Sequence, residues 1–500
     1  MIFQILIRFA DIFILIATIF LIIYSIYLYQ RKWIQLLRLA FKLPGPYAFP
    51  FIGNGLNFAC KAEELLERAV KVVKPYVNLT PMRLWLGPML CVIISKPRDL
   101  EIILNSQQAI EKGFSYKFLK PFIGEGLISG SGPIWKSHRK IVAPILTQKI
   151  LDKFLIIFDR HSRNLMRELK SLSNGREIDI LGPIELCTAN IVCETVLGCD
   201  DTESMLDSTK EFLHHSAEMY RVAIDRVMKI WLYPDFIYKF TENYKINLKG
   251  RKILTNFVQQ CIEKVKTRRK LNKENKNSIL DRILDILEKS DNKMSEEELK
   301  DEMITIFLAS QDTLAVISSF AILMLGIHEK IQDDARIEVM RIFADNSNSM
   351  DIEKLSQLKF IEKIVKETLR LFPIAPIMAR TTIGEIKLDS CTIPESCQII
   401  LIPFLTHRNS EYFHEPEKFN PERFDPADAV ERHPYSFIPF SAGPMGCIGQ
   451  RFAMMSLKTI IANFLRNYKI TSQVQLKEIQ LKTDISIRSK NGYKVSLKLI

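Results

Sequence analysis

The stretch FSAGPMGCIG, residues 440–449, places a single cysteine, Cys447, in a loop of small residues. Glycines such as Gly443 and Gly449 let a backbone approach a flat ligand closely and accept positive φ angles. Residues 450–464 are predicted to be helical, so Cys447 would precede a helix N-terminus, where the helix dipole lowers the pKa of a thiol. A lone loop cysteine is more often structural. The loop alone therefore leaves two interpretations, a thiolate metal ligand or an ordinary thiol.

Size and charge limit the class of protein. The chain has 500 residues, of which 47% are hydrophobic, so it can bury a large core. A formal net charge of +12 favours acidic partners or anionic membrane surfaces. We expect no nucleic-acid partner, because the charge is spread along the chain and no nucleic-acid-binding motif is present. Nine cysteines without regular spacing indicate a reducing compartment rather than a disulfide framework.

The N-terminal segment predicts a membrane anchor. Residues Ile12–Tyr29 are uncharged and mostly apolar, and as a helix they would reach about 27 Å, close to a hydrocarbon core of about 30 Å. Basic residues follow, which predicts that the rest of the chain faces the cytosol. A cleaved signal peptide is the alternative, but no small-residue cleavage site follows the run. The predicted organisation is an anchor at 1–32, a basic linker with a Pro/Gly hinge at 33–46 and one large domain at 47–500.

The rest of the chain predicts a mainly α fold with small β-sheets (α+β). Residues 77–96 predict a short hairpin and residues 493–499 a final strand. Ser295 and Glu298 form a capping-box pattern that opens a long helix. This helix is apolar nearly all round, so we expect it in the middle of the core. The basic stretch 264–278 predicts a solvated helix end and loop.

Motifs along the chain resemble those of the cytochrome P450 superfamily. The loop FSAGPMGCIGQRFA is similar to its haem-thiolate loop, Phe-x-x-Gly-x-Arg-x-Cys-x-Gly. The family's other motifs follow in order: a Trp-x-x-x-Arg pair, an acid–alcohol pair in the long helix, Glu-x-x-Arg, Pro-x-x-x-Arg, and the segment that completes a Glu-Arg-Arg triad, at Trp135–Arg139, Ala309–Thr313, Glu367–Arg370, Pro376–Arg380 and Phe419–Phe424. The residues around these motifs are most similar to those of insect microsomal family-4-type enzymes.

The resemblance implies the cytochrome P450 fold with one N-terminal transmembrane helix, and a haem-thiolate catalytic domain at 47–500. Cys447 would be the protein ligand of the iron in haem b. The haem-binding residues would be Trp135, Arg139, Arg380, Phe440, Gly443, Cys447 and Gly449. Asp312 and Thr313 would be the catalytic acid and alcohol that deliver protons. The structural triad would be Glu367, Arg370 and Arg423.

Ordinary structural interpretations stand beside several of these motifs. The Glu-x-x-Arg pattern also occurs at Glu218 and at Glu338, and helical spacing pairs such side chains in any case. Trp135 and Arg139, four residues apart, would also form a cation–π contact. The Thr313 hydroxyl would also bond back to a helix carbonyl. The assignment of each motif therefore depends on where its side chains lie.

Four residues depart from the family pattern near the expected haem. Met445 stands where arginine is usual, and methionine cannot donate a hydrogen bond to a propionate. Ser310 replaces a glycine, and Leu314 replaces a hydroxyl residue. Ala309 falls where many family-4-type enzymes carry the glutamate that ties haem covalently to the protein. We therefore expect haem to be non-covalent apart from the cysteine–iron bond, with the two motif arginines left to hold its propionates.

The resemblance also implies a function, a monooxygenase of the endoplasmic reticulum membrane with its domain on the cytosolic side. It would insert one oxygen atom from dioxygen into a lipophilic substrate, such as a fatty acid, a terpenoid hormone or a xenobiotic. Electrons would come from NADPH through a cytochrome P450 reductase, with cytochrome b5 as a further donor, because the chain has no flavin or nucleotide fingerprint. The alternatives are a haem-binding protein without oxygenase activity and a haem-thiolate isomerase that needs no reductase. Segments 107–127 and 211–240 are expected to line the substrate pocket.

Overall fold

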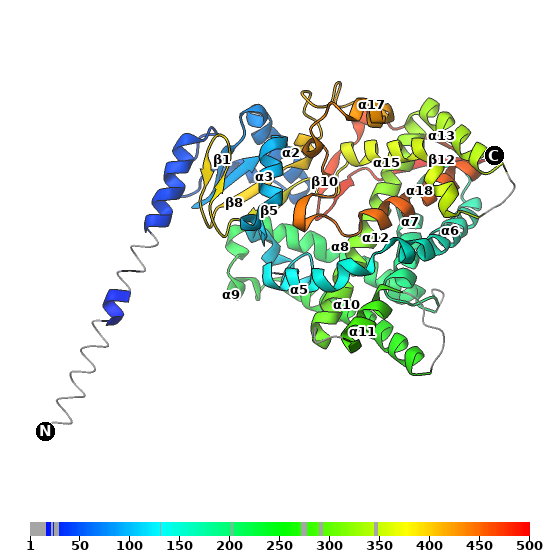
Figure 1. Cartoon of the computed structure of the whole chain (residues 1–500), viewed down its shortest axis with the longest axis horizontal. Helices are drawn as coiled ribbons and strands as arrows, with labels where there is room; N and C mark the ends of the chain where they lie inside the picture. The colour runs from blue at the N-terminus through cyan, green and yellow to red at the C-terminus, as the bar shows by residue number, and fades with distance from the viewer. Residues whose placement is uncertain are drawn as a thin grey trace.

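The computed structural model describes residues 17–21, 24, 30–130, 132–201, 204–271, 278–289, 294–344 and 349–500. Within these residues, helices form a large lobe, and the largest sheet lies at one end, beside the helix that leads toward the N-terminus (Figure 1). The mainly α fold with small sheets predicted from the sequence is therefore confirmed.

The helices are long in the middle of the domain and short at its edges. Residues 30–42 are helical. The bounds of the other helices are α2 Leu65–Val73, α3 Pro97–Asn105, α4 Lys120–Ile123, α5 Gly132–Val142, α6 Gln148–Lys170, α7 Leu181–Thr195, α8 Leu206–Met228, α9 Asp235–Tyr238, α10 Glu242–Lys270, α11 Ile279–Lys289, α12 Glu296–Ile327, α13 Glu329–Ile342, α14 Ile352–Gln357, α15 Lys359–Leu371, α16 Pro403–Thr406, α17 Pro426–Ala429 and α18 Gln450–Asn467.

The strands form small sheets with mostly antiparallel pairing. Their bounds are β1 Met82–Leu86, β2 Met89–Ile94, β3 Glu111–Lys112, β4 Asn174–Asp179, β5 Met378–Thr381, β6 Ile386–Lys387, β7 Thr392–Ile393, β8 Gln398–Leu401, β9 Tyr468–Thr471, β10 Leu481–Thr483, β11 Ile487–Ser489 and β12 Lys494–Leu499. The largest sheet has the order β1-β2-β8-β5-β3, with β2 and β8 parallel. The others are β4-β12-β9, β10-β11 and β6-β7. The β1–β2 hairpin and β12 confirm the strands predicted from the sequence.

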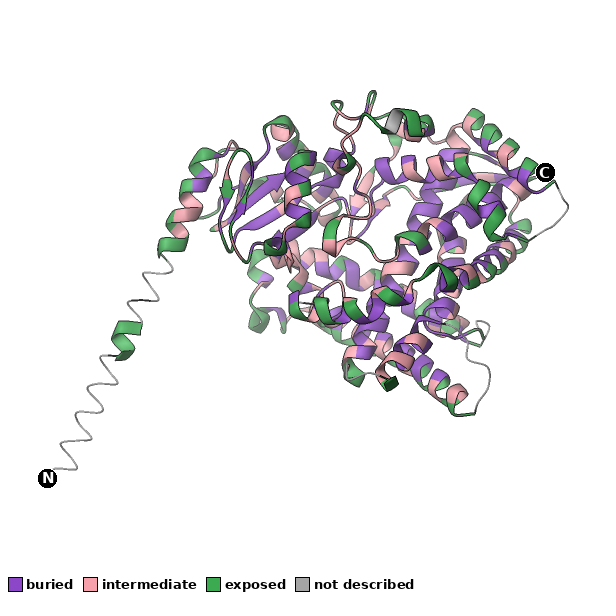
Figure 2. Cartoon of the chain, in the orientation of Figure 1, coloured by how far each residue is buried: buried purple, intermediate pink, exposed green. Residues whose placement is uncertain are grey.

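Helix α12 is the axis of the core. Ser295 caps it: the Glu298 N–H donates to the Ser295 hydroxyl at 3.1 Å, and the Ser295 N–H donates to the Glu298 carboxylate at 2.7 Å. Figure 2 shows buried residues along α12 and its neighbours, and α12 packs against α7, α10, α15 and α18. The capping box and the central helix are therefore confirmed. An all-round apolar helix has no face that favours water, so other helices surround it.

Most of the predicted membrane anchor lies outside the described residues. Of Ile12–Tyr29, the structure describes only 17–21 and 24. Among the described residues, α12 alone has the length and hydropathy to cross a membrane, and 78% of its apolar window is buried inside the protein. The hydrophobicity of α12 is explained by its place in the core. The transmembrane helix expected at the N-terminus stays a prediction.

The segment predicted as a basic linker, residues 33–46, is partly folded onto the domain. Residues 30–42 form a helix, and Leu39, Ala40 and Leu43 are buried in the core cluster around the largest sheet. The apolar face of this helix therefore belongs to the domain, while its other face carries the basic residues that the sequence pattern emphasised.

The basic stretch at 264–278 is bound rather than solvated where it ends α10. Arg268 donates to both carboxylate oxygens of Asp281 at 2.8 Å. Arg269 donates to Asp285 at 2.8 Å. The prediction of a solvated helix end is wrong for these two arginines, because α11 supplies carboxylates that bind them. Residues 272–277 lie outside the described part of the chain.

Candidate active site

The cysteine loop lies between a 3-10 turn, Gly443–Met445, and helix α18. The Cys447 N–H donates to the Phe440 carbonyl at 2.8 Å, which closes the loop. Gly443 has φ +68°, and a Cβ at this position would overlap the Leu104 carbonyl of α3. Only glycine fits here, because it lacks a Cβ and accepts a positive φ. The loop therefore has one shape, with its backbone pressed against α3.

Cys447 is the one exposed residue among the nine free cysteines. Protein atoms still surround its sulfur, and this burial raises the pKa of the thiol, while the Gly449 N–H and the Arg139 guanidinium lower it. The N–H of Gly449 at the start of α18 lowers this pKa, as the sequence predicts, but removal of the sulfur from water raises it by more, so that the net pKa shift is upward. An iron cation would reverse the balance, since a metal-bound thiol loses its proton.

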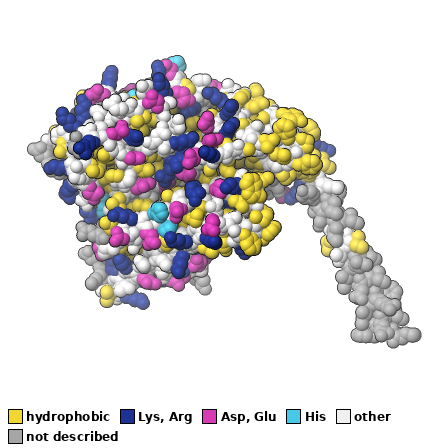
Figure 3. Space-filling model, turned by 180° about the vertical axis from the view of Figure 1, so that it is seen from behind, with side chains coloured by type: hydrophobic (Ala, Val, Ile, Leu, Met, Phe, Trp, Pro, Cys, Tyr) yellow, Lys and Arg dark blue, Asp and Glu magenta, His cyan; other side chains and the backbone are white. Residues whose placement is uncertain are grey.

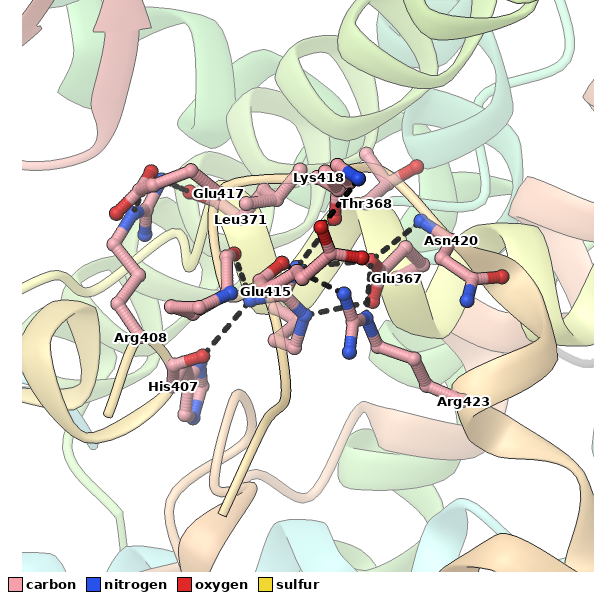
Figure 4. A network of polar contacts seen from close by, with 12 residues as sticks. Glu367, Thr368, Leu371, His407, Arg408, Glu415, Glu417, Lys418, Asn420 and Arg423 are labelled. Carbon is pink, nitrogen blue, oxygen red and sulfur yellow. Dashed lines mark hydrogen bonds and ion pairs between the residues drawn. The ribbon is translucent and has the colours of Figure 1, made fainter. Parts of the chain in front are cut away.

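The predicted triad residues Glu367, Arg370 and Arg423 meet in one buried network (Figure 4). Arg370 donates to both oxygens of Glu367, at 2.7 and 2.9 Å, and Arg423 reaches the same carboxylate at 3.3 Å. The guanidinium groups also donate to backbone carbonyls of one connecting segment, those of His407, His414, Glu415, Pro416 and Lys418. The network therefore ties the segment 407–423 to α15.

The other two Glu-x-x-Arg matches act elsewhere. The Glu338 carboxylate accepts hydrogen bonds from the backbone N–H groups of Lys359, Phe360 and Ile361, at 2.9, 2.8 and 3.1 Å, and so caps the start of α15. Glu218 pairs with two histidines on its own helix. The tertiary structure, and not the spacing, therefore distinguishes the Glu-x-x-Arg pair of the buried network from the two other sequence matches.

Three cationic side chains gather beside the cysteine loop. Arg139 donates to the Gly446 carbonyl at 2.8 Å, and its guanidinium lies 5.7 Å from the centre of the buried Trp135 ring. Arg380 of β5 is buried, and Lys112 faces it across the β3–β5 pair. Burial and the charges of Arg380 and Arg139 lower the pKa of Lys112 to about 7. Within the described ranges, no carboxylate forms an ion pair with any of these three cations.

This arrangement fits the propionate side of a haem group. One buried and two half-buried cations that repel one another are costly unless an anion balances them, and the two carboxylates of haem b would do so through charge-assisted hydrogen bonds. The Cys447 sulfur is a soft donor that suits iron. The motifs identify Arg139 and Arg380 but miss Lys112. No local signal marks this lysine, because strand pairing brings it beside Arg380 from a distant part of the chain.

Asp312 and Thr313 lie on different sides of α12, since successive helical residues differ by about 100°. Thr313 is half-buried, and its hydroxyl donates to the Ala309 carbonyl at 2.7 Å. This bond is the ordinary structural alternative for that residue. Asp312 is buried and forms an ion pair with Arg488 of β11. The structure therefore does not bring the acid and the alcohol into contact.

Arg488 is a residue of this region that sequence motifs did not identify. It also lies 3.4 Å from Glu185 of α7. Burial lowers the pKa of Arg488, but Asp312 and Glu185 raise it by more. All three side chains border a cavity of about 340 Å³, which Gln311 and His214 also line. Asp312 therefore has a polar cavity on its own side of α12.

The two segments expected to line the substrate pocket contact each other. The rings of Phe114 and Phe118 have their centres 6.1 and 4.8 Å from the centre of the Tyr233 ring. Phe122 and Tyr220 make a further contact at 5.4 Å. Segments 107–127 and 211–240 therefore form one aromatic interface, and their role toward a substrate stays a prediction.

Comparison with known proteins decides the family. A family model for cytochrome P450 matches residues 43–497. The chain belongs to the cytochrome P450 family. Similar relatives include cytochrome P450 4V2 of Rattus norvegicus, 31% identical over 94% of this chain and 91% of that protein. Cytochrome P450 4c3 of Drosophila melanogaster is 31% identical over 94% and 91%, and cytochrome P450 4c21 of Blattella germanica is 32% identical over 90% and 91%.

Membership in the cytochrome P450 family makes this protein a haem-thiolate monooxygenase with haem b as its cofactor. Enzymes of this family work with a redox partner and act on lipophilic substrates. The family resemblance inferred from the motifs is confirmed, and so is its likeness to family-4 enzymes, which include insect proteins.

Proposed function

We propose that this P450 inserts one oxygen atom from dioxygen into a fatty acid, a terpenoid hormone or a xenobiotic, with Cys447 as the iron ligand. The observation that carries the proposal is the cysteine loop joined to the cation cluster, since Arg139 donates to the carbonyl of Gly446, the residue before Cys447. Arg139, Arg380 and Lys112 would hold the haem propionates. Haem supplies the oxidation chemistry when it is bound, and the residues of the chain position it and move protons.

The electron donor in this proposal is NADPH-cytochrome P450 reductase, with cytochrome b5 as a second donor. A cavity of about 530 Å³ lies next to the cysteine loop and is lined by Phe440, Gln450 and Arg451. Arg451 is exposed, and a basic rim of this kind suits an acidic protein surface. A donor bound there would deliver electrons close to Cys447.

Reconstitution tests the proposed reaction. Full-length protein in lipid, with reductase and NADPH, should form an oxygenated product from a lipophilic compound selected by a substrate-binding spectral screen. Omission of NADPH or of reductase should stop product formation. A rearranged product formed without reductase would instead support the isomerase. Haem binding without product from any compound that binds would support the haem-binding alternative, which Met445 and Ser310 favour.

Asp312 is proposed to deliver protons from the polar cavity on its side of α12. Replacing Asp312 with asparagine keeps its size but removes the acid, and general acid catalysis is worth about 100-fold or more. Product formation should therefore fall by about that factor while NADPH oxidation continues, so that hydrogen peroxide accounts for the difference. The measurement is product and peroxide formed per NADPH consumed.

Glu185→Gln is the matched control for this variant. It weakens the interaction of Arg488 with Glu185 but leaves the Asp312 carboxylate in place. We expect its ratio of product to peroxide to stay near that of the wild type. An Asp312→Asn enzyme with wild-type coupling would show that the carboxylate serves only as a structural partner of Arg488.

Met445→Arg is expected to slow haem loss. The residue lies in the turn Gly443–Met445, where the family pattern has an arginine. A charge-assisted hydrogen bond to a propionate is worth about 1.5–3 kcal/mol, which corresponds to at least about tenfold slower transfer at about 1.4 kcal/mol per decade. Haem transfer to an apo-acceptor protein measures the rate. Met454→Arg, on the adjoining helix, is the control for added charge. Faster transfer from Met445→Arg would show that the loop is packed around methionine.

The proposed location is the endoplasmic reticulum membrane, with the domain in the cytosol. Large apolar side chains are exposed at the end of the molecule where the chain leads to the N-terminus (Figures 1 and 3). They are Phe41, Tyr47 and Phe51 on the N-terminal side and Trp231, Phe236 and Phe240 around α9. Exposed apolar patches of this kind indicate contact with a membrane or a protein. They support a domain that rests on the membrane beside its anchor.

Protease added to intact microsomes should therefore digest the domain, while a lumenal marker protein survives until detergent is added. Asn78 lies in a glycosylation sequon, Asn78-Leu79-Thr80, and it should carry no glycan because a cytosolic domain does not meet the lumenal enzymes. A protected domain or a glycan on Asn78 would reverse the proposed topology.

A further inference from the structure

Helix α8 carries a compact group of metal-binding side chains away from the cysteine loop. His214, His215 and Glu218 offer ligand atoms that all lie within 4.8 Å of one another. The His215 Nδ1 atom is 2.9 Å from Glu218 Oε2, and the His214 Nε2 atom is 3.9 Å from the same oxygen. In the described part of the chain, no second group of three histidine, cysteine or carboxylate ligands is this close.

We propose that His214, His215 and Glu218 bind a divalent transition-metal ion, with zinc as the ion of choice. Two imidazoles with one carboxylate are a donor set for zinc and its neighbours in the periodic table, whereas magnesium and calcium prefer all-oxygen sites. Zinc with bonds of about 2.0–2.1 Å in a tetrahedron needs ligand atoms about 3.3 Å apart. The separations of 2.9 and 3.9 Å from Glu218 to the two histidines lie on either side of this value, and the ligand nitrogens of His214 and His215 lie within 4.8 Å of each other.

The helix orders two of the three ligands before any ion binds. The His215 side chain is only 8% exposed and already contacts Glu218, three residues on. His214 is 70% exposed, so its ring is free to turn toward the ion at little cost in packing. The outer side of the group faces solvent, and water would complete the coordination, as at zinc sites with three protein ligands.

The charges around the group do not oppose a cation. His214 lines the same cavity as Lys210 and Arg488, but Glu185 and Asp312 line it as well. The two carboxylates balance the two cations, and Glu218 adds a negative charge at the ion itself. The site is thus distinct from the haem region in its ligands, while it shares a cavity with Asp312.

Zinc binding to the full-length protein in detergent tests this site. Equilibrium dialysis should show a zinc ion that is held by the wild type and lost from His214→Ala and Glu218→Gln. Loss of an outer-shell partner alone weakens metal binding by about 10- to 100-fold, so loss of a ligand should weaken zinc at least about tenfold. X-ray absorption should show only nitrogen and oxygen neighbours, at about 2.0–2.1 Å.

His433→Ala is the control, because His433 has a single carboxylate neighbour, Glu101 at 3.5 Å, and should not hold zinc by itself. Its zinc affinity should equal that of the wild type. Equal affinity in the His214 and Glu218 variants would overturn the proposal. So would sulfur neighbours at about 2.3 Å, which would assign the ion to a cysteine, or displacement of zinc by equimolar magnesium.

Discussion

Replacing Cys447 with serine is expected to abolish the red-shifted absorption band of the carbon monoxide complex of the reduced protein. That band would require a thiolate ligand on the haem iron, and a serine hydroxyl does not ionise to a comparable soft ligand. Loss of the band should be complete, and the pigment that remains should absorb as haem without sulfur ligation. The measurement is the reduced difference spectrum with carbon monoxide.

Cys60→Ser is the matched control, because Cys60 is a free and partly exposed thiol outside the loop. Its band should equal that of the wild type. A thiolate band in Cys447→Ser would contradict the assignment of Cys447 as the iron ligand. Loss of the band in Cys60→Ser would indicate that Cys60 is the ligand instead. The pKa of Cys447, which burial raises, does not change this expectation, because iron binding removes the thiol proton.

Replacing Glu367 with glutamine is expected to lower the free energy of unfolding more than any other substitution proposed for this protein. Glu367 is fully buried and balances two buried guanidinium groups, those of Arg370 and Arg423. An amide has almost the same shape but no charge, so it leaves both cations without their anion. Breaking a buried ion pair in this way costs about 3–5 kcal/mol. Denaturant unfolding should show this decrease in the free energy of unfolding.

Glu422→Gln, in the turn that carries Arg423, is the control for removal of a carboxylate. Glu422 pairs with Lys363 at 2.7 Å, but its side chain is 59% exposed. Solvent screens such a pair, so we expect a change of no more than about 1 kcal/mol. Equal effects of the two substitutions would show that the Glu367 network contributes no more than a surface pair.

The Cys447 and Glu367 substitutions distinguish the role of the iron ligand from the role of the buried network that stabilises the fold. Cys447→Ser should lose the spectral signature while the buried Glu367 network, which does not include Cys447, stays in place. Glu367→Gln should lose stability, and haem loss should follow only where the segment 407–423 loosens. An identical pattern in both variants would argue against the division of roles between the loop and the network.

Local patterns in the sequence were enough for features that depend on neighbouring residues. The capping box of Ser295 with Glu298, the central helix that follows it, and the β1–β2 hairpin all arise from hydrogen bonds and periodicity within a few residues. The turn in the cysteine loop is partly of the same kind, because Gly443 has a positive φ, but its close approach to Leu104 of α3 is a tertiary contact. The family could be inferred from such motifs because their order along the chain is specific.

Tertiary contacts determine which charged side chains form pairs, and local sequence patterns do not specify these partners. The sequence predicts that Arg268 is solvated, but the structure places it against Asp281 of α11. Lys112 joins Arg380 only through strand pairing. The pairing of Arg488 with Asp312 joins β11 to α12. Each of these contacts depends on the packing of elements distant in sequence, whereas amphipathic periodicity tells only which face of an element is buried. The sequence alone therefore determined the elements, the loop and the family, and the tertiary structure determined the partners of the buried charges.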